Sequence, residues 1–160
     1  MVESSPRPAA ARLRLVCFTL HDQEYGVAIE SVKETLAVRP ITRMFLTPPW
    51  LAGIMNLRGD VVAVLDLARF LGMPPTGTGD DSRIVVVRRG ALVVGILVDR
   101  MAEVRQLDPA AILPPPPTVP ADVADVLRGI ASVDGAAVRV LDVVALFDSD
   151  RVRALERGGS

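Results

Sequence analysis

The sequence is poor in the residues from which metal sites and many enzyme active sites are built. Its 160 residues contain one cysteine, Cys17, and one histidine, His21. A single cysteine excludes an internal disulfide, and these two residues cannot supply the usual nitrogen and sulfur ligands of a transition-metal site. No serine has a G-x-S-x-G context, and neither a P-loop nor a dinucleotide-binding fingerprint occurs. We therefore expect no catalytic residue, no bound metal and no cofactor.

A strong charge of one sign and long hydrophobic runs are also missing. Eighteen basic residues oppose 19 acidic ones, without the clustered basic surface that nucleic-acid binding requires. The run ALVVGILV (91–98) is far shorter than the roughly 20 apolar residues of a membrane span. The N-terminal MVESSPRPAAARLRL lacks the continuous apolar stretch of a signal peptide. We expect a cytoplasmic protein that binds no nucleic acid and inserts into no membrane.

What is present is a valine-rich chain of a length that suits one domain. Half of the residues are hydrophobic and only 4% are aromatic. Valine favours strands because its branched Cβ packs well on a pleated surface. Residues 1–11 are rich in proline, alanine and serine and are expected to form a flexible tail. Proline and glycine predict loops at 73–82 and 113–120.

The chain contains an internal duplication. EYGVAIESVKE (24–34) and VVGILVDRMAE (93–103) share glycine and acidic positions at an offset of 69 residues. LAGIMNLRGDVVAVLD (51–66) and LRGIASVDGAAVRVLD (127–142) match at an offset of 76. Glycines and acids that recur in order at fixed offsets argue against chance similarity between valine-rich segments. We therefore predict two copies of one small β-unit.

The two copies span about residues 13–72 and 82–148. Short alternating strands with glycine turns predict compact barrels or sandwiches. Each copy ends in an aspartate, Asp66 or Asp142, that precedes an apolar run. Because aspartate is a good N-cap, a short helix is predicted after each. The apolar spacing breaks at 148–150, which leaves two continuations open: a kinked helix or a separate last helix.

Residues that differ between the copies are free to serve something other than the shared fold. Arg58 is matched by Asp134, which reverses the charge at one structural position. This reversal argues against a need for Arg58 in the architecture. A structural ion pair is the alternative, and both interpretations hold together if the guanidinium keeps spare donors. Glu34 has the counterpart Glu103, so a capping or turn role shared by both copies is expected for it.

Three other residues that could have functional roles, His21, Cys17 and Trp50, have structural explanations. His21 lies in the predicted turn HDQE between two strands, where a solvated turn residue is expected. Cys17 lies within the predicted first strand, where cysteine is most often inert core. Trp50 is expected to close one end of a barrel, with a role as an anchor for a partner as the alternative.

Several motifs together resemble the CheW family of chemotaxis coupling proteins. They are FTLHDQEYGVAIESVKE, ITRM, PPWLAGIMNLRGDVVAVLDL and RIVVVRRGALVVGILVDRMAEV. The resemblance runs from about residue 12 to about residue 148. It implies a mainly β fold of two intertwined SH3-like five-stranded barrels with short helices, in a CheW-like domain at 12–150. Residues 151–160 are then the end of a C-terminal helix or a tail.

The resemblance also implies a function without catalysis. Members of the family couple the cytoplasmic tips of methyl-accepting chemoreceptors to the regulatory domain of a CheA-type histidine kinase, in arrays associated with the membrane. The positions that match the family's receptor-binding groove are Val32, Glu34, Gly53, Asn56, Leu57 and Arg58. Those that match its kinase-binding surface are Ile41 and Thr42. In the family, the residues that match Glu34 and Arg58 are thought to pair.

The sequence departs from the family at three of these motif positions. Ala63 stands where proline is usual, Asp60 where an aliphatic residue is usual, and Trp50 where a smaller residue is common. Asp60 puts a charge close to Arg58 in the sequence and could change the choice of partner.

Two other hypotheses remain open. One is a divergent homologue that binds a receptor but no kinase, or that serves a non-flagellar chemosensory output. The other is a carboxylate-dependent hydrolase on a duplicated barrel, with Asp60 and Asp66 or Asp80 and Asp81 as its carboxylates. This hydrolase would need a pocket with two close carboxyl groups of raised pKa.

Overall fold

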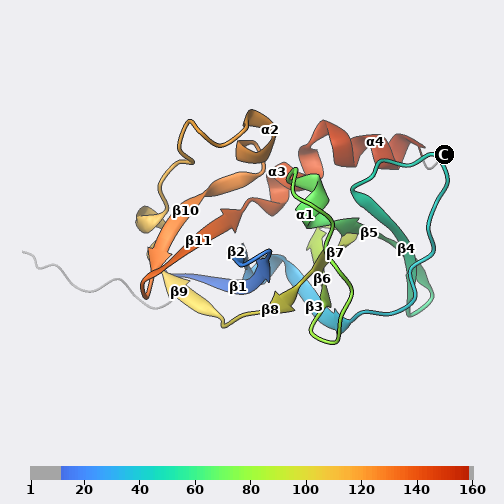
Figure 1. Cartoon of the computed structure of the whole chain (residues 1–160), viewed down its shortest axis with the longest axis horizontal. Coiled ribbons are helices and arrows are strands. Elements are labelled where there is room, and N and C mark those ends of the chain that lie inside the picture. Colours follow the sequence, from blue (N-terminus) through green and yellow to red (C-terminus); the bar gives the residue numbers. More distant parts are fainter. Residues whose placement is uncertain (1–11, 159–160) are drawn as a thin grey trace, which may run out of the picture.

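Two β-sheets make up most of the computed structural model, which describes residues 12–158 (Figure 1). The predicted tail at 1–11 lies outside the described residues. Each sheet takes strands from both halves of the chain. The six-stranded sheet has the order β10 (Leu127–Val133), β11 (Ala136–Leu141), β2 (Gln23–Ala28), β1 (Leu13–Leu20) and β8 (Arg100–Met101), with β9 (Arg105–Leu107) also on β1. The five-stranded sheet has the order β3 (Val32–Ala37), β6 (Arg83–Arg89), β7 (Leu92–Val98), β5 (Asp60–Asp66) and β4 (Leu51–Leu57).

Strand pairing confirms the duplication. β2 and β11 pair in parallel with Gly26 opposite Val140, and β7 and β5 pair in parallel with Gly95 opposite Val64. These equivalent pairs are related by the offsets of 69 and 76 that the sequence shows. β8 and β9 together occupy along β1 the place that β3 occupies along β6, with an interruption at 102–104. β8 and β9 therefore correspond to a single strand, β3, of the first copy, which explains why the first sheet counts six strands and the second five. The predicted pair of SH3-like barrels is confirmed.

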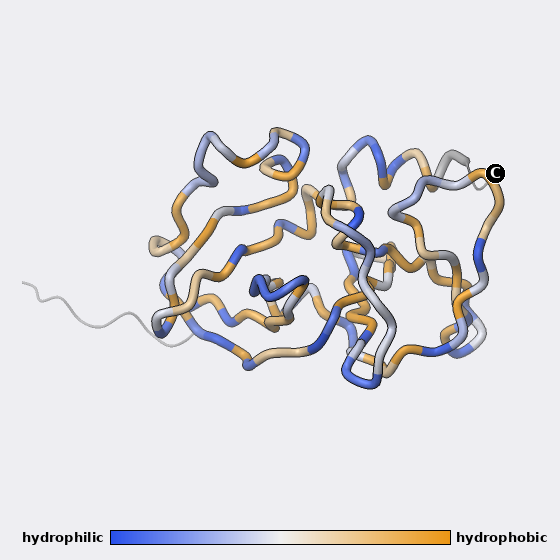
Figure 2. The backbone as a smooth tube through the Cα atoms, in the orientation of Figure 1, coloured by the Kyte–Doolittle hydropathy of each residue, from blue (hydrophilic) through white to orange (hydrophobic). Residues whose placement is uncertain are grey.

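The strands form where branched aliphatic residues are concentrated, and Figure 2 shows hydrophobic stretches along them with hydrophilic ones at several turns. β6, with the sequence RIVVVRR, is buried over its centre. Ile84 and Val86 belong to the hydrophobic cluster inside one barrel, whereas Val85 and Val87 belong to the larger cluster shared by the two barrels. Because successive side chains point to opposite faces, a strand between two clusters needs a continuous apolar run.

Two short helices begin at the predicted aspartate caps. The Asp66 carboxylate accepts a hydrogen bond from the Arg69 backbone N–H before α1 (Leu67–Phe70), and Asp142 accepts one from Ala145 before α3 (Val143–Asp148). The chain is extended at Ser149, so α4 (Asp150–Gly158) is a separate last helix, one of the two predicted continuations. The remaining helical segments are η2 (Ile29–Ser31), η3 (Pro109–Ala111) and α2 (Ala121–Ala124).

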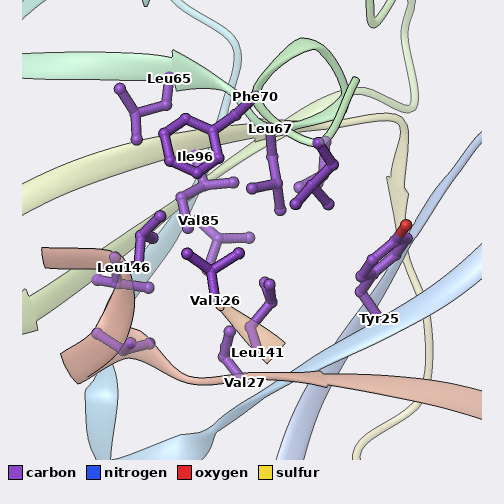
Figure 3. Close-up of a cluster of buried hydrophobic side chains, with 14 of the residues drawn as sticks. Tyr25, Val27, Leu65, Leu67, Phe70, Val85, Ile96, Val126, Leu141 and Leu146 are labelled. Atoms are coloured by element: carbon purple, nitrogen blue, oxygen red, sulfur yellow. The ribbon is translucent and has the colours of Figure 1, made fainter. Parts of the chain in front are cut away.

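The larger hydrophobic cluster joins the two barrels and the helices above them (Figure 3). Leu65 and Phe70 of the first copy meet Ile96, Val126 and Leu141 of the second copy in this cluster. The Trp50 ring belongs to the same cluster and makes an edge-to-face contact with Phe70, with ring centroids 5.1 Å apart. Trp50 is therefore buried in the cluster that joins the two barrels and is not an exposed anchor. Among the described residues, every helix is too short or too polar to cross a membrane.

Candidate partner-binding site

The β4–β5 hairpin presents an arginine at a backbone position that arginine rarely occupies. Arg58 has a φ of 52° and Gly59 a φ of 90°, so both central residues of this two-residue turn are left-handed. Such turns match the twist of the flanking strands and favour Asn-Gly or Asp-Gly. The equivalent turn of the other copy, Asp134–Gly135, follows that preference with φ values of 50° and 81°. Arg58 is thus a local departure from good turn chemistry, of the kind that marks functional sites.

The Arg58 side chain forms a two-point ion pair with Glu34 on β3, the strand at the opposite end of the sheet order from β4. Arg58 Nη1 lies 2.5 Å from Glu34 Oε2, and Nη2 lies 2.7 Å from Oε1. Hydrogen bonding to this guanidinium lowers the pKa of the Glu34 carboxyl below its usual value. The Arg58 side chain nevertheless remains 66% exposed, against 21% for Glu34. A guanidinium has five N–H donors, so Arg58 is fixed in place and still presents free donors to solvent.

The two copies do not share the ion pair. Glu103, the counterpart of Glu34 in the sequence, is exposed and forms no ion pair with any described residue. In the second copy Asp134 lies 3.5 Å from Arg105 on β9, and Arg105 also pairs with Glu24. The role of Glu34 is therefore specific to its copy, and the predicted capping or turn role shared with Glu103 is wrong.

The other predicted receptor-binding residues fall into two places. Val32 is half-buried two residues before Glu34 in β3, and Asn56 is exposed at the hairpin, where its side-chain oxygen accepts a hydrogen bond from Gly59 N–H at 3.0 Å. Leu57 is only 3% exposed and belongs to the hydrophobic cluster inside the barrel. The Leu57 side chain therefore packs inside the barrel and is not accessible to a partner.

Gly53 lies with the predicted kinase-binding residues and not with Arg58. A Cβ at position 53 would lie 2.2 Å from the Thr42 carbonyl oxygen and 2.8 Å from Ile41 Cγ2. The close approach is held by two backbone hydrogen bonds between Thr42 and Ile54, of 2.8 and 2.9 Å. Ile41 is half-buried and Thr42 is exposed. Gly53 thus allows the segment that carries these two residues to lie against β4.

An apolar loop beside these residues was not anticipated from the sequence. Met44, Phe45 and Leu46 follow the Thr42 contact and are exposed, with Phe45 at 97% and Leu46 in a left-handed conformation. The signal available in the sequence was three consecutive large apolar residues, outside any strand pattern and separated from a proline pair by one threonine. Arg43 and Arg69 line a hollow beneath this loop.

The residues considered for chemistry lie at the two ends of a strand, in the core and in exposed turns, the last including Asp80 and Asp81. Asp60 and Asp66 are the two ends of β5, about 20 Å apart for a seven-residue strand. Cys17 is buried, and this burial raises the pKa of its thiol to about 12. His21 is exposed in the β1–β2 turn, where its Nε2 lies 2.8 Å from the Pro74 carbonyl oxygen. Among residues 12–158, no group of three histidine, cysteine or acidic side chains could hold a metal ion.

Comparison with known proteins agrees with this arrangement. A family model described as the CheW-like domain matches residues 14–151. The chain belongs to the CheW-like domain family. This membership confirms the resemblance of the sequence motifs and covers both interleaved copies of the β-unit.

Relatives of known name match over most of their length. A probable chemotaxis protein CheW from Rhizobium etli is 33% identical over 141 residues, which are 88% of this chain and 90% of that protein. Protein FrzA from Myxococcus xanthus is 34% identical over 143 residues, 88% of this chain and 89% of its own. The crystal structure of the scaffolding protein TtCheW from Thermoanaerobacter tengcongensis superimposes with a TM-score of 0.78 at 31% identity, over 94% of both chains.

Proposed function

We propose that this protein is a non-catalytic adaptor that couples the cytoplasmic tip of a chemoreceptor to the regulatory domain of a CheA-type histidine kinase. It would act in the cytoplasm and be recruited to receptor arrays at the membrane. Membership of a family whose named relatives are chemotaxis proteins and a scaffolding protein supports the general role. The receptor, the kinase and the residues that contact them are part of the proposal.

The exposed Arg58–Glu34 pair is the observation that supports the proposed receptor-binding site most directly. Its guanidinium stands at the tip of a hairpin, in a strained turn, with donors that face solvent. Half-buried Val32 on the same edge strand supplies an apolar contact beside this charge. A receptor tip made of a helical hairpin can pack an apolar face against Val32 and place an acceptor on Arg58.

The kinase site is proposed around Ile41 and Thr42, on the segment that Gly53 allows to lie against β4. Thr42 faces solvent while its backbone is fixed on both sides by Ile54. Gly53 belongs functionally to this second site, because a side chain there would displace the segment. Both sites lie along β4: Thr42 bonds its middle residue, Ile54, and Arg58 follows its last residue.

The test is a reconstitution with three purified components: this chain, a receptor cytoplasmic fragment and the kinase regulatory domain. We expect the receptor fragment to retain the kinase domain on a column only when this chain is present. Arg58→Ala should weaken receptor binding at least tenfold and leave kinase binding unchanged, whereas Thr42→Lys should do the reverse.

Matched controls come from the second copy of the β-unit. Asp134→Ala changes the equivalent turn position, and Thr118→Lys places the same charge on an exposed threonine of the second copy. Neither should change binding of either partner. Failure of this chain to bind any receptor fragment would refute the proposal, and receptor binding without kinase binding would identify the divergent homologue considered above.

A further inference from the structure

A second hollow, of about 200 Å³, brings the loop at 73–82 next to two arginines. Arg43, Arg69 and Thr78 all line it. Arg43 precedes the apolar loop and Arg69 lies in α1, so three separate segments of the chain meet here. Both guanidinium groups belong to exposed residues, and neither forms an ion pair or a hydrogen bond within the described part of the chain. The hollow therefore presents two cations that the described fold does not use.

The 73–82 loop is anchored on both sides of Thr78. Before it, the Thr76 N–H donates a hydrogen bond to the Asp66 carboxylate, 3.1 Å from Oδ2. After it, the Ser82 hydroxyl makes two hydrogen bonds within the loop, of 2.9 and 3.0 Å. Thr78 itself is exposed, and its hydroxyl forms no hydrogen bond with any of the residues that the structure describes. The loop thus presents this one threonine between two fixed points.

Accessibility distinguishes Thr78 from the other two hydroxyl groups of the loop. Thr76 is 7% exposed and Ser82 is 4% exposed, so an enzyme can reach neither without unfolding the loop. The glycines on both sides of Thr78 lie in open space, because a Cβ on Gly77 or on Gly79 would meet no atom within 4 Å. An enzyme can therefore approach the Thr78 hydroxyl without obstruction from the rest of the fold.

We propose that Thr78 is a phosphorylation site and that Arg43 and Arg69 bind the phosphate once it is attached. The phosphoryl donor is ATP, used by a serine/threonine protein kinase. Thr78 Oγ forms a bond to the γ-phosphorus of ATP, and the bond from that phosphorus to the oxygen bridging to the β-phosphorus breaks. ADP leaves, and the hydroxyl proton passes to a base of the kinase.

A phosphothreonine suits this hollow by its charge and its geometry. It carries a charge of about −1.5 to −2 at neutral pH and three strong acceptor oxygens. A guanidinium group binds phosphate through two parallel N–H···O hydrogen bonds, and two such groups balance its full charge. The Asp66 carboxylate also lines the hollow and repels a phosphate. Asp66 is only 6% exposed, however, and its oxygens already accept hydrogen bonds from the backbone N–H groups of Arg69 and Thr76, so the two free cations dominate.

Phosphorylation would cancel the positive charge that this hollow presents to solvent. Ile41, a predicted kinase-binding residue, lines the same hollow. The modification would thus change binding of the CheA-type kinase, and this consequence alone rests on the proposed function. The experiments use only this chain, so their failure is distinct from a failure of that function.

Mass spectrometry of the full chain isolated from its own cells tests the modification. We expect phosphate on Thr78 and none on Thr76 or Ser82, because only the first hydroxyl is accessible. The variant Thr78→Ala should carry no phosphate in this loop. Phosphate absent from Thr78 throughout growth and starvation, or present equally on the buried Thr76, would overturn the proposal.

Phosphorus NMR of the full chain with phosphothreonine incorporated at position 78 tests binding of the phosphate by the two arginines. The second pKa of the phosphate, ordinarily about 6, should fall by about 0.5 or more, because nearby cations favour the doubly charged form. Tm at neutral pH should rise by about 2–4 °C relative to the chain without phosphate, since the new hydrogen bonds join three segments.

The matched variants of the phosphorylated chain remove two exposed arginines each. Arg43→Gln/Arg69→Gln should abolish both effects. Arg88→Gln/Arg100→Gln, which removes the same charge from residues that do not line the hollow, should keep both. Circular dichroism confirms that each variant is folded. A phosphate pKa that is the same with and without Arg43 and Arg69 would show that these side chains do not bind it and would overturn the proposal.

Discussion

Replacing Gly53 with alanine tests the close approach on which the proposed kinase site depends. The new Cβ would lie 2.2 Å from the Thr42 carbonyl oxygen, so the segment at positions 41 and 42 must move away from β4. Two backbone hydrogen bonds to Ile54 would be lost, at about 1 kcal/mol each. The φ of 149° adds about 1–2 kcal/mol for a residue with a side chain. Gly53→Ala should therefore lower the free energy of unfolding by about 3–4 kcal/mol.

Urea denaturation and calorimetry measure this loss, which should lower Tm by roughly 10 °C in a chain of this size. Gly129→Ala is the matched variant in the other copy, because its Cβ would lie 2.2 Å from the Leu113 carbonyl oxygen, and it should cost a similar amount. Gly59→Ala has a positive φ but no atom within 4 Å, and should cost only about 1–2 kcal/mol. Equal losses for Gly53→Ala and Gly59→Ala would refute the argument that a steric contact positions this segment.

Two further predictions concern carboxylates. Because Arg58 lowers the pKa of Glu34, the ion pair stabilises the folded state at neutral pH and this stabilisation is lost as the pH falls through the lowered pKa. The difference in urea midpoint between the unmodified chain and Glu34→Gln should therefore shrink between pH 7 and about pH 3, and a difference that grows on acidification would contradict the ion pair. Asp66 accepts hydrogen bonds from the N–H groups of Arg69 and Thr76, whereas Asp142 accepts one, from Ala145. Asp66→Ala should cost about 2–3 kcal/mol and Asp142→Ala about 1 kcal/mol, and the reverse order in chemical denaturation would show that the second hydrogen bond adds nothing.

Sequence reasoning predicted the features that depend on local chemistry repeated in both copies. The aspartate caps at Asp66 and Asp142 followed from a side chain that accepts backbone N–H groups next to an apolar run. The duplicated β-units followed from glycines at fixed offsets, since Gly53 and Gly129 each permit the same close approach. Such positions are visible in one sequence because each copy serves as a comparison for the other.

Features that depend on distant contacts were harder to predict. The sequence cannot show that Glu34 reaches Arg58 while Glu103 reaches no described cation, because the matching strand of the second copy is interrupted at 102–104, where Glu103 lies. The exposure of Phe45 and Leu46 also escaped prediction, since apolar residues are normally assigned to a core. Leu57 is the opposite case. It lies in the sequence between two predicted site residues, Asn56 and Arg58, but its side chain is buried.

The central claim is that Arg58 presents a positive charge to a partner and is not needed for the fold. The most direct measurement is the affinity of a receptor cytoplasmic fragment for the exchanged variant Glu34→Arg/Arg58→Glu, determined by calorimetry beside a thermal unfolding curve. The exchange keeps an ion pair between the two strands and reverses the charge at the hairpin tip. We predict an unchanged Tm and an affinity at least tenfold weaker. An exchanged variant that binds the fragment as tightly as the unmodified chain would contradict the claim.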